Sequence, residues 1–370
     1  MDLDLAPEQE LLAESVRRTC ARHAGMDVVR KLENDPLGYS VALWEQLAGL
    51  GVLGMMIPER HGGSDMSLLD AAVVYAELGA ALAPAPHLVS CVLSAGLLQR
   101  LAPQAVQDEW LPRVSSGEAI LSVAWLEPDG GFTERGITTT LTADGDGWRL
   151  SGRKRHVAFA RAADRLLTIA RGPDGIALAL VDPTSSGVRL DQQLTIAGDA
   201  QYAVTFEDVR LEPSALFATG GAWAALNATM LEVAILVGAQ AAGGARAALD
   251  LAVDYAGKRE QFDRPLGAFQ AIAHYLADST TAVDGAETLV WEAAWSHTQG
   301  RPVDKLAPMA KLFACRTFRD VTAMAQQVFG GNGFTVDFDV QLYFRRAKSL
   351  QVSWWDERHL EQLIAAQVLD

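Results

Sequence analysis

The stretch YAGKREQFDRPLGAFQAI, residues 255–272, holds the densest group of ligand-type side chains in the sequence. A helical pattern ends here, a turn carrying Pro265 and Gly267 follows, and another helical pattern begins. Arg259 suits a diphosphate group, because its guanidinium can make two parallel charged hydrogen bonds. Phe262 can cover the edge of a flat ring such as adenine. The same residues also fit a salt-bridged helix corner that binds nothing, so both interpretations are open at this point.

Helical patterns extend on both sides of this stretch. They predict one long helix or two in tandem over 222–258, and further helices over 272–300, 307–328 and 356–368. Four helices with short connections indicate a bundle. The chain is also predicted to be helical up to about residue 118, with one helix starting at Pro7.

The middle of the chain has the pattern of strands instead. The segments 137–141 and 148–150 flank Asp144-Gly145-Asp146-Gly147, which is a hairpin signal. Many short strands with Gly and Pro turns predict a small barrel or sandwich. Further strands are expected at 119–125, 165–170, 176–181 and 202–206.

The predicted fold is therefore mainly α with a central β domain. We expect an N-terminal helical domain over 1–118, a middle β domain over 119–217 and a C-terminal helical bundle over 218–370.

Composition disfavours several classes of function. The 370 residues carry a formal net charge of -15, which disfavours binding to a nucleic-acid backbone. Three widely spaced cysteines without a CxxC pair predict buried free thiols, with neither a disulfide framework nor a metal site. The apolar stretch 233–249 contains Gln240 and Arg246, which favours a buried helix over a membrane span. The N-terminus is acidic and shows no signal-peptide pattern, so we expect a cytoplasmic protein.

A second candidate stretch is QQVFGGNGF at residues 326–334. Three glycines at a helix end permit positive φ angles and let a ligand approach the backbone closely. A plain helix C-cap followed by a turn is the alternative interpretation.

Together the two stretches resemble signatures of the acyl-CoA dehydrogenase family, R-x-x-F-G…F-Q-A and Q-x-x-G-G-x-G. The resemblance implies that this chain contacts the FAD held by a neighbouring subunit. Asp263 departs from the pattern, since the family has Gly there, and its carboxylate is expected to compete for Arg259 or to repel a diphosphate. The residues carried over to the FAD contact are Arg259, Gln261, Phe262, Gln270, Gln327, Gly330 and Gly331.

The likeness covers nearly the whole chain. Residues 58–63 resemble the family's P-E-x-x-G-G loop, Glu127–Pro128 its E-P turn, and 152–154 its G-x-K strand entry. The middle region departs from the family at 129–134 and at 156–159, where the family has a Gly/Ser-rich loop and a W-I-T-N flavin segment.

The resemblance implies α,β-dehydrogenation of an acyl-CoA thioester, in which a carboxylate removes the α-proton while a hydride passes to the flavin. In most of the family the base is a Glu within a Y-E-G stretch. That Glu aligns with Trp354 and the following Gly with Trp355, and neither indole accepts a proton. Asp356 and Glu357 are alternative bases, although carboxylates there also fit a plain helix start.

A minority of the family carries its base on the long helix before the Arg motif, and Glu232 lies near that position. It is the only acidic residue between Ala222 and Arg246. A buried carboxylate there would suit a general base, whereas a Glu on an exposed helix face would have no such role.

The retained and lost features indicate a division of labour between two chains. Residues 82–86, 343–348 and 356–363 look similar to subunits of bacterial heteromeric (α2β2) acyl-CoA dehydrogenases that act on steroid-derived CoA thioesters. This resemblance implies an acyl-CoA substrate, a homologous partner subunit that carries the base, and an electron-transfer protein as acceptor. Two other hypotheses stay open: a non-catalytic structural partner, and a self-sufficient homotetramer that uses Glu232.

Overall fold

A computed structural model describes residues 5–218 and 220–369. The elements follow the predicted order of helices, strands and helices. By its contacts the chain forms two compact units, which group the first helices with the last ones. The predicted domain boundaries near residues 118 and 217 follow a different division and stay a prediction. Unit 1 comprises Met1–Arg30, Ser67–Ala83 and Ala234–Asp370, and unit 2 comprises Lys31–Met66 and Pro84–Val233.

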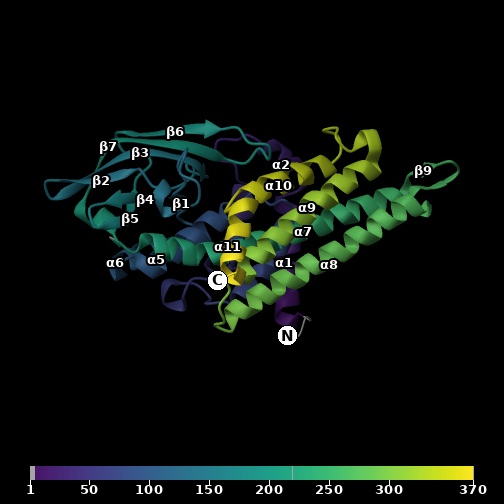
Figure 1. The fold of residues 1–370 in the computed structure, drawn as a ribbon, viewed down its shortest axis with the longest axis horizontal. Coiled ribbons are helices and arrows are strands. Elements are labelled where there is room, and N and C mark those ends of the chain that lie inside the picture. Colours follow the sequence, from purple (N-terminus) through teal and green to yellow (C-terminus); the bar gives the residue numbers. More distant parts are fainter. Residues whose placement is uncertain (1–4, 219, 370) are drawn as a thin grey trace. The chain divides into compact units, whose positions relative to one another are not determined.

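Unit 1 is helical. In Figure 1, α7, α8 and α9 run side by side, with the small β9–β10 hairpin at the end where α7 and α8 meet. The N-terminal part of α7 belongs to unit 2. The elements are α1 (Pro7–His23), α2 (Met26–Lys31), α4 (Leu68–Ala80), α7 (Ala222–Lys258), β9 (Glu260–Gln261), β10 (Arg264–Pro265), α8 (Gln270–Thr298), α9 (Leu306–Phe329), α10 (Val340–Val352) and α11 (Glu357–Leu369).

Local sequence signals account for where the first helices of unit 1 begin. Pro7 is the first residue of α1. Its lack of a backbone N–H costs nothing there, because an N–H at this position would have no partner within the helix. The Ser67 hydroxyl accepts a hydrogen bond from Asp70 N, and the Asp70 carboxylate accepts one from Ser67 N. This reciprocal pair is a capping box, which starts α4 at the next residue.

Within unit 1, α7 packs closely against α4 because glycines face a neighbouring backbone. A Cβ atom on Gly79 would lie 2.0 Å from Gln240 O, and one on Gly243 would lie 1.9 Å from Ala76 O. Neither position accepts a larger residue unless a backbone moves. α7 is long and apolar enough to cross a membrane, but 67% of its most apolar window is buried inside the protein, as in a core helix.

Unit 2 combines helices with a mixed sheet. Among the described residues this sheet has eight strands in the order β6-β7-β3-β2-β4-β5-β8, with β1 parallel to β4. The predicted hairpin joins β2 to β3, with Asp144 paired to Gly147. The strands are β1 (Leu121–Ala124), β2 (Thr140–Asp144), β3 (Gly147–Ala158), β4 (Arg165–Gly172), β5 (Gly175–Val181), β6 (Val188–Gln193), β7 (Gln201–Leu211) and β8 (Leu216–Phe217), and the helices are α3 (Val41–Gly49), a π-helix (Leu88–Ser94), α5 (Ala95–Leu101) and α6 (Gln104–Ser115).

Several elements were not predicted from the sequence pattern, among them α10 and β6. α10 follows the glycine-rich stretch directly and carries a run of basic residues, yet it buries Leu342, Tyr343 and Ala347. β6 lies at the edge of the sheet and pairs with β7, and none of its residues is fully buried. Its alternation of Val188 and Leu190 with the exposed Arg189 and Asp191 covers only four residues. Between 222 and 258 the chain forms one continuous helix rather than two.

Candidate cofactor-binding site

The helix corner singled out in the sequence forms a tight hairpin after α7. Arg259 N donates to Tyr255 O at 2.8 Å, and Leu266 N donates to Arg259 O at 2.8 Å, so the chain reverses between these residues. Phe262 and Asp263 at the tip have φ angles of 54° and 59°. Non-glycine residues adopt this left-handed conformation uncommonly. We call residues 259–270 the α7–α8 corner.

Phe262 at the tip of this corner faces outward. Phe262 is 88% exposed, the largest exposed fraction among the large hydrophobic residues described. Its ring meets Phe269 edge to face at 6.2 Å, and the Arg264 guanidinium lies 3.9 Å from the Phe269 ring centroid. A phenylalanine with this much exposed surface contributes little to the core, so its surface is available to a ligand or another chain.

The glycine-rich stretch follows α9. Gly330 has φ 62° and ψ -136°, a conformation that essentially only glycine adopts. A Cβ atom built on Gly330 or Gly331 would meet no atom within 4 Å. The backbone here is therefore open to close approach by another molecule. We call residues 327–333 the glycine turn.

An aromatic cluster brings the two stretches together within unit 1. The Tyr255 ring, one helical turn before Arg259, stacks on Phe329 with centroids 4.1 Å apart and an interplanar angle of 15°. Phe338 meets both rings edge to face, at 6.5 Å and 5.7 Å. Asn332 Nδ2 donates to the Tyr255 hydroxyl at 3.3 Å. Tyr255 and Phe329 lie within the two stretches, but no pattern in the sequence predicted that their rings would stack.

The seven residues predicted to contact FAD all lie at these two places. Each of them is exposed in the chain by itself: Arg259, Gln261, Phe262, Gln270, Gln327, Gly330 and Gly331. The Gln261 side chain donates to the Glu260 carbonyl at 2.7 Å.

Glu232, the candidate base, lies in the part of α7 that belongs to unit 2. Its side chain is buried, with 6% of the residue exposed, as a base in an apolar pocket would be. Its Oε1 atom accepts a hydrogen bond from Arg100 Nη2 at 2.5 Å. This ion pair gives the carboxylate a structural role, and a base function would require it to open.

The tryptophan pair aligned with the family's base lies in a turn between α10 and α11. Trp354 and Trp355 have φ angles of 53° and 76°. Lys311 of α9 is fully buried and donates to Trp355 O at 2.8 Å and to Leu350 O at 3.1 Å. Burial lowers the pKa of Lys311, since it disfavours the charged ammonium. The left-handed backbone at Trp355 agrees with the alignment of this residue to a glycine.

The two carboxylates after this turn serve the start of α11. Asp356 Oδ1 accepts a hydrogen bond from His359 N at 2.9 Å, as an N-cap residue does. Glu357 forms an ion pair with Arg316 of α9, and hydrogen bonding to that guanidinium is the main cause that lowers its pKa. Their contacts fit the helix-start interpretation.

In unit 2, the E-P turn and the G-x-K strand meet through a buried ion pair. Lys154 Nζ lies 2.6 Å from Glu127 Oε1, with the residues 1% and 3% exposed. Burial alone would raise the pKa of Glu127, but Lys154, together with donors from Thr138 and Thr139, lowers it to about 2. Burial lowers the pKa of Lys154 to about 8, and Glu127 opposes that change.

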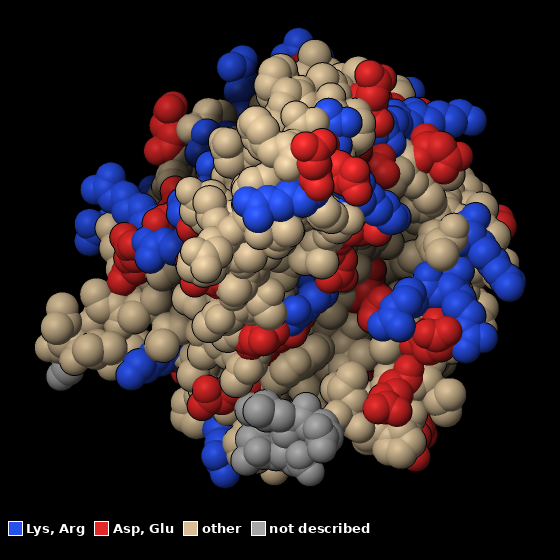
Figure 2. Space-filling model, turned by 90° about the vertical axis from the view of Figure 1, so that its right-hand side faces the viewer, with Lys and Arg blue, Asp and Glu red and all other residues tan. Residues whose placement is uncertain are grey.

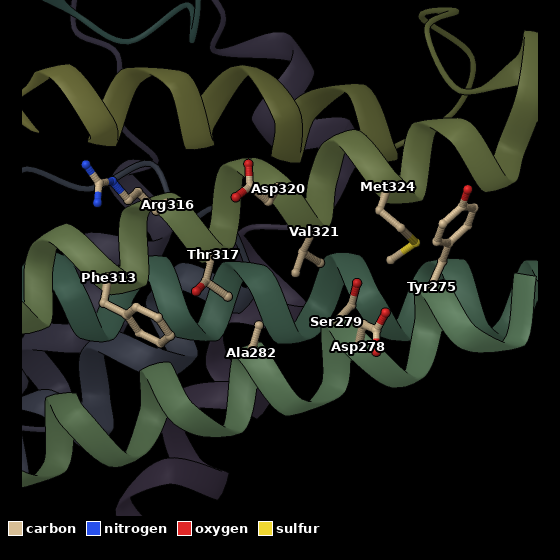
Figure 3. Close-up of a pocket in the computed structure, with 10 residues that line it drawn as sticks. All are labelled: Tyr275, Asp278, Ser279, Ala282, Phe313, Arg316, Thr317, Asp320, Val321 and Met324. Carbon is tan, nitrogen blue, oxygen red and sulfur yellow. The ribbon is translucent and has the colours of Figure 1, made fainter.

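Open depressions lie in both units. In unit 2 a depression of about 580 Å³ is lined by Thr133, Glu134, Arg135 and Arg171, within and beside the loop that departs from the family pattern. In unit 1 a groove of about 510 Å³ lies between α8 and α9. Figure 3 shows that Tyr275 of α8 and Met324 of α9 line one end of this groove, whereas Phe313 lines the other.

Comparison with known proteins decides the family. Sequence models described as the N-terminal, middle and C-terminal domains of acyl-CoA dehydrogenase match residues 6–118, 122–209 and 220–356. The chain belongs to the acyl-CoA dehydrogenase family. The predicted fold class, a helical N-terminal part, a middle β part and a helical C-terminal part, is thereby confirmed.

Relatives of this acyl-CoA dehydrogenase chain align over nearly its whole length. Benzylmalonyl-CoA dehydrogenase of Aromatoleum aromaticum (strain DSM 19018 / LMG 30748 / EbN1) is 31% identical and covers 100% of both chains. A chain of the ChsE4-ChsE5 complex from Mycobacterium tuberculosis superimposes with a TM-score of 0.91 at 26% identity, covering 100% of this chain and 99% of that one. A chain of the Tcur3481-Tcur3483 steroid ACAD variant gives 0.86 at 31% identity, covering 98% and 99%.

Members of this family are FAD-dependent, as predicted, and the donor set of the corner fits that cofactor. Arg259 supplies a cation for a diphosphate, the glutamines supply amides for polar ring edges, and Phe262 supplies an exposed flat ring. The open backbone at Gly330 and Gly331 leaves room for a nucleotide. Figure 2 shows basic and acidic side chains interspersed over one face of the molecule, so any attraction for a phosphate there is local.

Proposed function

We propose that this chain is a subunit of a FAD-dependent acyl-CoA dehydrogenase and that its α7–α8 corner and glycine turn contact the FAD of a neighbouring subunit. The observation that carries the proposal is the meeting of these two stretches at one end of unit 1, with every predicted FAD-contacting residue exposed. Bound there, FAD supplies the hydride acceptor for α,β-dehydrogenation of an acyl-CoA thioester.

The residues of this chain bind and orient rather than transfer protons. Arg259 holds the diphosphate through charge-assisted hydrogen bonds. Phe262 covers a ring and excludes water from it. The base comes from the partner subunit, because Trp354 and Trp355 occupy the aligned position and Asp356 and Glu357 are engaged at the start of α11.

We further propose a homologous partner subunit in an α2β2 assembly, a bulky, steroid-type acyl group, and an electron-transfer protein as acceptor. The structural likeness to chains of the ChsE4-ChsE5 complex and of a steroid ACAD supports the first two. The assignment places the protein in lipid and steroid catabolism in the cytoplasm.

The test is Arg259→Ala in the complex co-expressed with the partner subunit. Loss of the bidentate contact is expected to weaken FAD binding by about 10- to 100-fold. The readout is the flavin count per chain, with Arg22→Ala, an exposed arginine on α1, as the matched control. Unchanged flavin and turnover in the Arg259 variant would leave only a structural partner role.

The self-sufficient homotetramer is the second candidate, and the burial of Glu232 favours it. The chain purified alone would then contain stoichiometric flavin and oxidise acyl-CoA, and Glu232→Gln would abolish turnover while leaving flavin bound. A colourless chain that gains flavin only with its partner excludes this candidate.

A further inference from the structure

We propose that Tyr255 is a positioning residue, whose ring stack on Phe329 sets the distance between Arg259 and the backbone of Gly330 and Gly331. The inference rests on the proposed function, because it concerns how the α7–α8 corner and the glycine turn are held at a fixed distance for FAD binding.

The backbone links each stacked ring directly to one part of the proposed FAD contact. Tyr255 O accepts the hydrogen bond from Arg259 N at 2.8 Å, so the last turn of α7 carries the position of Tyr255 directly to Arg259. Phe329 is the last residue of α9, and Gly330 follows it without a spacer. The stacked rings therefore join the two residues nearest to the parts that contact the ligand.

The ring stack of Tyr255 on Phe329 is stiff. Two parallel rings with centroids 4.1 Å apart resist sliding when a third ring closes the edge, and Phe338 does so against both. Phe329 is 9% exposed, whereas the ligand-type residues beyond it are exposed. The cluster is thus a rigid support beneath an open surface.

A polar contact also joins the glycine turn to Tyr255. Asn332 Nδ2 donates to the Tyr255 hydroxyl at 3.3 Å, a longer contact than an ordinary hydrogen bond. A Cβ atom on Gly333 would lie 2.5 Å from Gln326 O, so the glycine turn is folded tightly back on α9. Stacking and this fold fix the turn, and the hydroxyl adds little.

These contacts predict that two substitutions of Tyr255 differ in their effect on FAD affinity. Tyr255→Leu removes the ring and is expected to weaken FAD binding by about three- to tenfold, the effect of losing the prior order of one side chain. Tyr255→Phe keeps the ring and is expected to bind FAD within about twofold of the parent, since a weak contact alone is lost.

The experiment measures FAD release by flavin fluorescence from the co-expressed complex, together with the melting temperature. Phe338→Leu, which removes the edge ring and leaves the stack, is a second variant in case Tyr255→Leu does not fold, and a smaller loss in the same direction is expected. A role confined to stability would lower the melting temperature of Tyr255→Leu without changing FAD affinity, and that result overturns the inference.

Three further outcomes separate this inference from the proposed function. If Tyr255→Phe binds FAD as weakly as Tyr255→Leu, the hydroxyl rather than the stack is responsible, and the inference fails. If Arg259→Ala retains FAD as well, the proposed function itself fails. Loss of FAD in Arg259→Ala with full retention in Tyr255→Leu refutes the positioning role alone.

Discussion

The α7–α8 corner and the Glu127–Lys154 pair use charged residues in opposite ways. At the corner, Arg259 is exposed, and Phe262, three residues further on, is 88% exposed. In unit 2, both charges are buried and face each other at 2.6 Å. Both places match family motifs, but only one of them is complete within the chain. We propose that the corner contacts another molecule, whereas both charges of the buried pair find their partner within unit 2.

The largest expected effect lies at the buried pair. Lys154→Met leaves the Glu127 carboxylate buried without its cation, which is expected to lower the free energy of unfolding by about 3–5 kcal/mol. Urea denaturation measures it. The double variant Glu127→Gln/Lys154→Met removes both charges and is expected to recover much of the loss. A single variant within about 1 kcal/mol of the parent would show that the pair adds little.

The pH dependence of stability sharpens the same comparison. The folded-state pKa of Glu127 is about 2, below its ordinary value of 4.5, so the unfolded state binds a proton first as the pH falls. The stabilisation by this carboxylate is complete above pH 4.5 and is lost as the pH falls from 4.5 towards 2. Melting temperatures across this window should fall more steeply in the parent than in the double variant. Parallel curves would contradict the assignment.

A smaller effect is expected at Asp263, the residue that departs from the family pattern at the corner. Asp263→Asn removes the charge and keeps a residue that tolerates its φ of 59°, whereas Asp263→Gly also relieves the backbone. If the carboxylate opposes the diphosphate, both variants are expected to bind FAD about two- to fivefold more tightly. Tighter binding by the Gly variant alone would identify the backbone as the cause.

The smallest effect on stability is expected at Phe262. Because the ring is exposed, Phe262→Ser should leave the free energy of unfolding within about 0.5 kcal/mol of the parent. FAD affinity in the complex should nevertheless fall, since we propose that the ring covers the cofactor there. Thermal unfolding of the isolated chain and a flavin titration of the complex measure the two quantities. A stability loss above 1 kcal/mol, on the scale of a core substitution, would show that the ring belongs to the fold.

Much of the fold could be predicted because its signals are local. Pro7 marks the start of α1, and Asp144-Gly145-Asp146-Gly147 marks a hairpin, in which Gly145 has a positive φ of 65°. α10 and β6 could not be predicted in this way, since packing against α9 and pairing with β7 decide them.

The candidate site was predictable in its residue types and not in its assembly. The sequence identified Arg259 and Gly330 as ligand-type positions, each from its own stretch. Nothing local indicates that Tyr255 and Phe329, far apart in the chain, stack on each other. The burial of Glu232 could be anticipated from its place in an apolar helix. Its ion pair with Arg100 could not, because Arg100 lies far away in the sequence.

The main-chain contacts of the Trp354–Trp355 turn have a consequence for engineering. Two bulky residues with left-handed backbone angles are held where the aligned family sequence has an acid and a glycine. Lys311 stabilises the path of the main chain by donating to the carbonyl oxygens of Leu350 and Trp355, and every amino acid has such an oxygen. Because these contacts involve only the main chain, Trp354→Glu is expected to keep the path of the turn and to place a proton acceptor at this position.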